Sequence, residues 1–103
     1  AYEFLREAAR ANGIHVHGGS IIEGGADKLF NTSLLFAPDG REIARYRKIH
    51  LFDITAPDGT GYRESALYGA GTELVCIEAG GVRCGLTVCY DMRFAEQFVA
   101  LRR

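Results

Sequence analysis

The chain has 103 residues, with 12 Lys and Arg against 13 Asp and Glu and a formal net charge of -1, which is enough for one domain and no more. Because both signs are interspersed rather than gathered in blocks, nucleic acid is excluded as a partner. The longest apolar runs fall far short of the roughly 20 residues that cross a membrane, so no membrane partner is expected.

Hydrophobic patterns along the chain predict a mixed order of helices and strands. In chain order they indicate a helix over residues 1–12, a strand over 14–22, a hairpin with arms 29–36 and 42–50, a second hairpin with arms 73–77 and 82–88, and a helix over 92–102. Pro38 and Gly40 between the first two arms are typical of a tight turn, and Asp91 is expected to cap the last helix. The segment 52–71 is longer than an ordinary connection and is a candidate functional loop.

Both ends of the chain, residues 1–103, lie inside helical patterns, and no initiator methionine is present. This predicts the central part of a single domain that is truncated at both ends. The three cysteines, Cys76, Cys84 and Cys89, have no C-x-x-C spacing, so neither a disulfide framework nor a zinc site is indicated. Free thiols fit a reducing compartment, and we expect a cytoplasmic protein.

Cys89 is the first candidate for chemistry, because it stands in GLTVCYDMRF, where a strand gives way to a helical pattern. The free backbone N–H groups and the dipole at the start of a helix favour the nucleophilic thiolate. The apolar residues of the strand alternate from Val82 to Val88, and Cys89 falls on the opposite face. A free cysteine is most often a small buried hydrophobe, which is the interpretation for Cys76 and Cys84. The bend at Cys89 favours a catalytic role there.

Lys48 is the second candidate. It shares a strand face with Ala44 and Tyr46, whereas Arg45 and Arg47 lie on the other face. A surface lysine would be the ordinary interpretation, but the apolar residues that follow predict that the strand enters the core, where an ammonium needs a carboxylate partner. A buried lysine beside a thiolate would stabilise an oxyanion.

Glu64 and the histidines give weaker signals. Glu64 lies in the long loop, where a glutamate is usually solvated. His15 and His17 alternate on a strand and so share a face, which permits two ligands of a metal site with His50 or a cysteine as a third. No carboxylate stands at a matched spacing, so we expect no metal site and no cofactor.

Several motifs in order resemble the nitrilase or carbon–nitrogen hydrolase superfamily: RKIHLFD, the Glu64-Ser65 pair and GLTVCYDMRFAEQ. GGSI and FNTSLLFAPDG match as well, so the resemblance extends over nearly the whole chain. Within the superfamily the chain is most similar to the ω-amidase group, in which Ala tends to follow the Arg-Phe pair, as Ala95 does here.

The resemblance implies an α/β fold, a partial four-layer α-β-β-α sandwich, with a Glu-Lys-Cys triad. Carried onto this chain, Cys89 is the nucleophile that forms a thioester as ammonia leaves. Lys48 and the backbone N–H of Tyr90 hold the oxyanion, and Glu64 helps to position the site. The implied substrate is a small carboxylic acid monoamide of the 2-oxoglutaramate type, and the full-length protein is expected to form homo-oligomers.

The family's general-base glutamate has no counterpart here, because Glu3 and Glu7 belong to the helix that follows its position. The piece alone is therefore expected to be inactive. Three alternatives stay open: a non-catalytic remnant or interaction module of the same fold, another carbon–nitrogen hydrolase such as a deaminated glutathione amidase or a nitrilase, and a redox-sensing role for Cys89.

Overall fold

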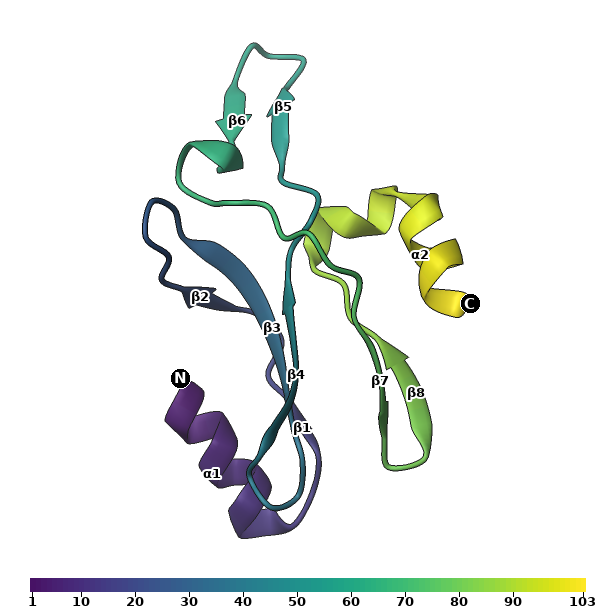
Figure 1. Ribbon diagram of the computed structural model, residues 1–103. Coiled ribbons are helices and arrows are strands. Elements are labelled where there is room, and N and C mark those ends of the chain that lie inside the picture. Colours follow the sequence, from purple (N-terminus) through teal and green to yellow (C-terminus); the bar gives the residue numbers. More distant parts are fainter.

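The computed structural model describes all residues, 1–103, and its elements form layers around a central sheet (Figure 1). The elements are α1 (Tyr2–Asn12), β1 (Val16–His17), β2 (Ile21–Glu23), β3 (Phe30–Phe36), β4 (Glu42–Arg47), β5 (Asp53–Thr55), β6 (Gly61–Arg63), β7 (Cys76–Ala79), β8 (Val82–Gly85) and α2 (Ala95–Arg102), with 3-10 turns η1 (Glu64–Ala66) and η2 (Cys89–Arg93). No helix has the length and apolar character needed to cross a membrane.

The central sheet is built around β3, which pairs antiparallel with β4 on one edge and with β1 and β2 on the other. The single strand expected over residues 14–22 is therefore wrong in detail. His17 lies opposite Leu35 and Ile21 opposite Thr32. From His17 to Ile21 the chain therefore advances four residues, while β3 advances three between their partners. The extra residue is absorbed at Gly18–Ser20, where Gly19 has a φ of 65°, and it divides the strand in two.

Both faces of β3 are covered, which explains its continuous run of buried residues. Leu34 and Phe36 pack with Ala9 of α1 on one face. Leu35 belongs to a second cluster on the other face, which also contains Ala44, Tyr46, Leu86 and Val88. The second cluster joins the β3–β4 pair to the β7–β8 hairpin, and this is the contact between the two inner layers.

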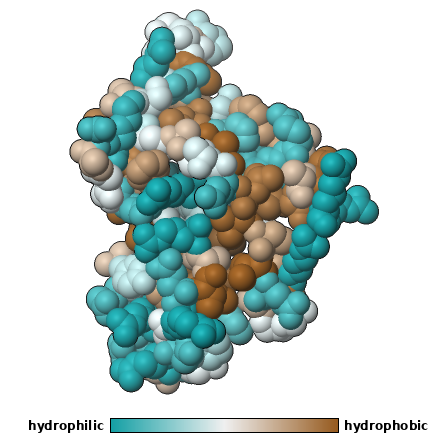
Figure 2. All heavy atoms as spheres, viewed as in Figure 1, coloured by the Kyte–Doolittle hydropathy of each residue, from teal (hydrophilic) through white to brown (hydrophobic).

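The fourth layer is α2, which lies against β8. A Cβ built on Gly85 would come within 3.2 Å of Leu101, so glycine permits the close approach of helix and strand. The order helix, sheet, hairpin, helix confirms the expected α/β fold with a partial four-layer α-β-β-α sandwich. Figure 2 shows hydrophobic side chains gathered between the sheet and the β7–β8 hairpin, with hydrophilic ones around them.

The long segment 52–71 has secondary structure of its own. It folds as the β5–β6 hairpin followed by η1. Its turn repeats the turn between β3 and β4: Gly40 and Gly59 have φ angles of 87° and 89°, and each donates its N–H to the alanine three residues earlier at 2.9 Å. The Ala-Pro-Asp-Gly sequence at 56–59 therefore indicates a hairpin turn, as the same sequence at 37–40 does.

Three expectations about the C-terminal part are wrong. Cys76 is exposed rather than buried and Cys84 only half-buried, because the face of β7 that carries Cys76 lies away from the inter-layer core. The last helix begins at Ala95 rather than Met92, since the 3-10 turn η2 comes first. Val82, expected on the apolar face, is 61% exposed because it lies next to the hairpin turn.

Candidate active site

Lys48 follows β4 directly and is 2% exposed. The parity of β4 sends Ala44 and Tyr46 into the inter-layer core, and Lys48 continues on the same side. Its Nζ donates a hydrogen bond to Glu64 Oε1 at 2.8 Å. The expected carboxylate partner of this buried ammonium is therefore present. Lys48 has three N–H donors and this is the one protein acceptor found for them, which leaves donors free for a ligand.

Glu64 is brought to Lys48 by the β5–β6 hairpin. Its Oε1 also accepts the backbone N–H of Phe52 at 2.7 Å, and its own backbone N–H donates to the Phe52 carbonyl at 3.3 Å. The side chain is 16% exposed. Glu64 is thus a fixed, mostly buried counter-charge rather than the solvated loop residue that position alone favoured.

Cys89 lies at the sharp bend between the strand direction and η2. It has a φ of 47°, and it is the sole non-glycine residue with a positive φ. This left-handed conformation costs free energy in a residue with a Cβ, and such residues cluster at functional sites. The residue is exposed. The bend agrees with the sequence, but the helix expected directly after Cys89 is a 3-10 turn.

One open cavity collects three of the four site residues expected from sequence. Lys48, Glu64 and Cys89 all line it, together with Asn31, Phe52, Gly61, Tyr62 and Arg63. The last five residues were not predicted from the sequence. Tyr62 and Arg63 could have been found, because they directly precede Glu64 in the chain. The cavity therefore offers an exposed thiol, a buried ammonium and an arginine to one ligand.

Tyr90 does not contribute its side chain to the cavity lining. Its ring packs edge-on against Phe52, with centroids 4.9 Å apart, and against Phe94 at 5.4 Å. The aromatic contact joins the wall of the cavity to the turn that carries the thiol. The oxyanion role expected for the backbone N–H of Tyr90 stays a prediction.

Asp91 is the polar residue that sequence analysis misjudged. It was expected to cap a helix over 92–102, but it is fully buried and its carboxylate accepts four hydrogen bonds from Tyr46, His50 and Val88. Burial alone would raise the pKa of Asp91, yet the hydrogen bonds from Tyr46, Val88 and His50 outweigh it and hold the pKa below its ordinary value.

The histidines considered as metal ligands are used in other ways. His17 Nε2 lies 2.6 Å from Ser33 Oγ, and His50 Nδ1 lies 2.8 Å from Asp91 Oδ1. The structure contains no group of three or more His, Cys, Asp or Glu side chains that could hold a metal ion.

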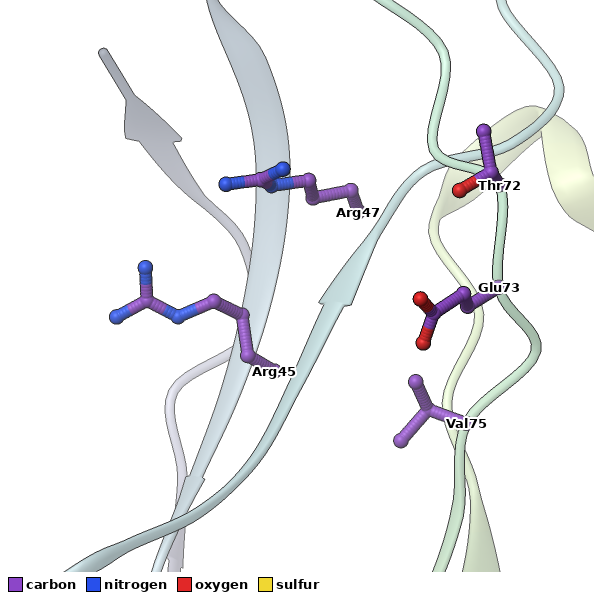
Figure 3. A pocket seen from close by; sticks show the side chains of 5 residues that line it. All are labelled: Arg45, Arg47, Thr72, Glu73 and Val75. Atoms are coloured by element: carbon purple, nitrogen blue, oxygen red, sulfur yellow. The ribbon is translucent and has the colours of Figure 1, made fainter. Parts of the chain in front are cut away.

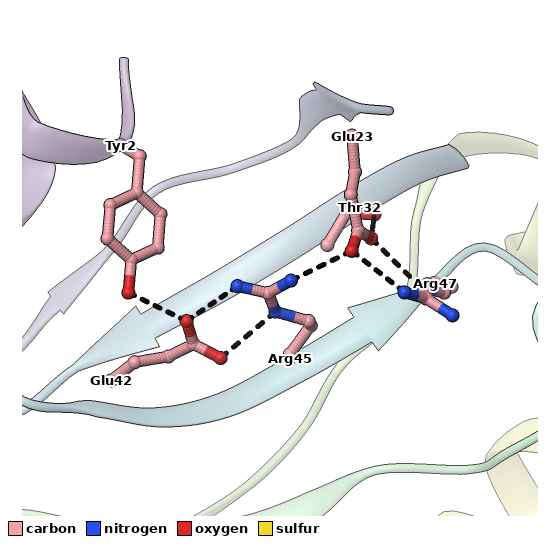
Figure 4. Close-up of polar contacts among 6 residues, drawn as sticks. All are labelled: Tyr2, Glu23, Thr32, Glu42, Arg45 and Arg47. Atoms are coloured by element: carbon pink, nitrogen blue, oxygen red, sulfur yellow. Dashed lines mark hydrogen bonds and ion pairs between the residues drawn. The ribbon is translucent and has the colours of Figure 1, made fainter. Parts of the chain in front are cut away.

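A second cavity lies between β4 and the segment before β7, away from Cys89. It is lined by Arg45, Arg47, Thr72, Glu73 and Val75. Figure 3 shows the two arginine side chains reaching from β4 over the neighbouring strand, with Glu73 and Val75 directed toward β4. Both guanidinium groups are already bound to Glu23 (Figure 4). This cavity therefore has no free cationic group.

Comparison with known proteins agrees with this geometry. The chain is similar to human omega-amidase NIT2, with 47% identity over 92 residues, which is 89% of the chain and 33% of that protein. The zebrafish (Danio rerio) omega-amidase NIT2 is 43% identical over 94 residues, covering 91% of the chain and 34% of the relative. The chain thus spans about a third of the length of these curated relatives.

Solved structures share the fold. The Caenorhabditis elegans NitFhit protein superposes with a TM-score of 0.88 at 34% identity, over 98% of this chain and 26% of that one. An amidase from Nesterenkonia sp. AN1, solved with acrylamide added at its active-site cysteine, gives a TM-score of 0.76 at 28% identity, over 93% of this chain and 35% of that one. The carbon–nitrogen hydrolase family model matches residues 1–103. The chain belongs to the carbon–nitrogen hydrolase family.

Proposed function

We propose that the complete protein hydrolyses the amide bond of a small carboxylic acid monoamide of the 2-oxoglutaramate type. The observation that carries the proposal is that the exposed thiol of Cys89 and the buried ammonium of Lys48 line one cavity. A nucleophile and an oxyanion-stabilising cation are the two groups that acyl transfer needs within reach of one carbonyl.

In the first half of the reaction, Cys89 Sγ attacks the amide carbon and forms a C–S bond. The carbonyl oxygen becomes an oxyanion, which the Lys48 ammonium and the backbone N–H of Tyr90 stabilise. The proton removed from the thiol passes by way of the base to the nitrogen and the C–N bond breaks. Ammonia departs, and the acyl group stays on Cys89 as a thioester. Water attacks the thioester carbon in the second half, the C–S bond breaks, and the carboxylic acid and the free thiol are released.

Glu64 holds Lys48 in place in this scheme. Because its Oε1 already accepts from Lys48 Nζ and from the Phe52 N–H, it fixes the direction of the ammonium. We propose that the base that takes the thiol proton is a glutamate outside residues 1–103. The cavity is correspondingly open, and further parts of the protein would complete its wall.

Arg63 gives the site a means of recognising the acid end of the substrate. It lines the same cavity as Cys89, and in the structure its guanidinium forms no ion pair within 4.0 Å. A guanidinium binds a carboxylate with two parallel hydrogen bonds. The proposed substrate therefore carries a carboxylate at the end away from the amide.

Three similar proteins support this function. The human and zebrafish relatives are named omega-amidases, and the structure of a glutamate-to-glutamine mutant of the Nesterenkonia amidase shows acrylamide added at its active-site cysteine.

The test is ammonia release from 2-oxoglutaramate by the complete protein. We expect Cys89→Ala to lower kcat by at least roughly a thousandfold, and Lys48→Met by about a hundredfold or more. Cys84→Ala is the matched control, since this half-buried thiol lies outside the cavity, and it should retain activity. Unchanged turnover in Cys89→Ala would overturn the mechanism, and an inactive complete protein would favour a non-catalytic remnant.

A further inference from the structure

The two reactive side chains of the proposed site come from segments far apart in sequence. Lys48 follows β4, whereas Cys89 follows β8. A catalytic pair works only if its members are held to within a fraction of an ångström. Neither Lys48 nor Cys89 bonds to the other in the structure, so a third group must set their relative position.

Asp91 bonds to both segments at once. Its Oδ1 accepts the backbone N–H of His50 at 2.9 Å and His50 Nδ1 at 2.8 Å. Its Oδ2 accepts the backbone N–H of Val88 at 2.9 Å and the hydroxyl of Tyr46 at 2.6 Å. Tyr46 and His50 flank Lys48 by two residues on either side, and Val88 directly precedes Cys89.

The hydroxyl of Tyr46 is locked in the direction of Asp91. Its oxygen accepts the backbone N–H of Ile49 at 3.2 Å and Gln97 Nε2 at 2.8 Å, so its own hydrogen is left for the carboxylate. Burial and then the hydrogen bond to Asp91 raise the pKa of Tyr46 to about 12, which keeps the hydroxyl protonated. All four acceptor positions of Asp91 are therefore met by fixed donors.

We propose that Asp91 is a positioning residue that sets the distance between the Lys48 ammonium and the Cys89 thiol. This inference rests on the proposed roles of those two residues. A carboxylate alone suits the arrangement, since each oxygen accepts two hydrogen bonds and an amide would place its N–H₂ group against two of the four donors. Asp91→Asn would therefore release one of the two segments and let the thiol turn move relative to the lysine.

The test is the electrostatic coupling between Lys48 and Cys89 in the complete protein. The alkylation rate of Cys89 by iodoacetamide is measured at pH 7 from the mass of its peptide. The Lys48 ammonium lines the same cavity as the thiol and can donate a hydrogen bond to the amide oxygen of iodoacetamide, so Lys48→Met should slow the alkylation by about tenfold when Asp91 is present. In the Asp91→Asn background, the same Lys48→Met change should slow it by less than about threefold.

Two further variants keep the test decisive. Tyr46→Phe removes one donor and keeps the ring, so Lys48→Met in this background should slow the alkylation by a factor between about threefold and tenfold. If circular dichroism shows that Asp91→Asn does not fold, the Tyr46→Phe variant tests the inference in its place. Asp39→Asn makes the same chemical change in an exposed turn and should leave the tenfold ratio intact.

An unchanged ratio in a folded Asp91→Asn or Tyr46→Phe variant would overturn the inference, because a merely structural residue would alter stability without altering this coupling. Alkylation does not require turnover. A complete protein that releases no ammonia but shows the expected ratios would refute the proposed function and retain the role of Asp91.

Discussion

The two faces of β4 use charge in opposite ways. Figure 4 shows one face, where Arg45 and Arg47 extend to Glu23 and Glu42 in an exposed ladder of hydrogen bonds. On the other face Lys48 makes a single ion pair, with Glu64. The arginine side chains are 39% and 45% exposed, whereas the side chain of Lys48 is 3% exposed.

The number of ion pairs does not mark the face of β4 that borders the cavity with Cys89. Pairs whose arginine is exposed gain little, because water and salt screen the guanidinium. A buried charge loses its hydration, so removing its one partner lowers the free energy of unfolding strongly. The face with the single buried pair is also the face that borders the cavity with Cys89.

The largest effect on stability is expected from breaking the buried pair. Glu64→Gln leaves the Lys48 ammonium buried without a counter-charge, and we expect a loss of about 3 kcal/mol in the free energy of unfolding. Urea denaturation measures it. The double variant Lys48→Met with Glu64→Gln should recover part of that loss, and a Glu64→Gln variant as stable as wild type would show that the two faces do not differ.

A smaller effect is expected from Glu23, the centre of the ladder. Hydrogen bonds from Arg47, opposed by burial and aided by Thr32, lower the pKa of Glu23 from 4.5 to about 2. Because the folded pKa is depressed, the stability from this group is present above about pH 4.5 and is lost as the pH falls toward 2. Glu23→Gln should cost about 1 kcal/mol at pH 7.

The pH dependence supplies the check on Glu23. The difference in unfolding free energy between wild type and Glu23→Gln should shrink below about pH 4.5 and be lost as the pH falls through about 2. A difference that stayed constant over this range would mean that the ionised carboxylate contributes nothing.

The smallest effect is expected from Arg45→Met. The variant keeps the aliphatic stem and removes contacts to Glu42 and Glu23, and exposed pairs of this kind contribute roughly 0.2–1 kcal/mol. Urea denaturation at low and high salt measures the change, which should decrease as salt screens the pair. A loss as large as that of Glu64→Gln would remove the distinction between the two faces.

Sequence alone predicted what depends on local pattern. The alternation through Arg45, Tyr46, Arg47 and Lys48 placed each side chain on the correct face, and the Ala-Pro-Asp-Gly turn placed the first hairpin. The bend at Cys89 was also predicted, although the dihedral angle that marks it is visible only in the structure.

Sequence missed what depends on partners far along the chain. Asp91 was interpreted as a helix cap because the residues after it have helical spacing, yet its carboxylate bonds to Tyr46 and His50, more than 40 positions earlier. Cys76 was assigned to the core on the general tendency of cysteine, and only the pairing of β7 with β8 shows which face it occupies. A local pattern carries no information on such contacts.

The most direct test of the central claim is to trap the acyl group on the complete protein. The protein is quenched in acid during turnover of 2-oxoglutaramate, and its peptides are mapped by mass spectrometry. The account predicts one acyl group, bound as a thioester to the peptide that contains Cys89, and none on the exposed Cys76. Ammonia release with the acyl group on another residue would contradict the role of Cys89. Ammonia release with no acylated peptide, in wild type and in Lys48→Met, would contradict the thioester intermediate.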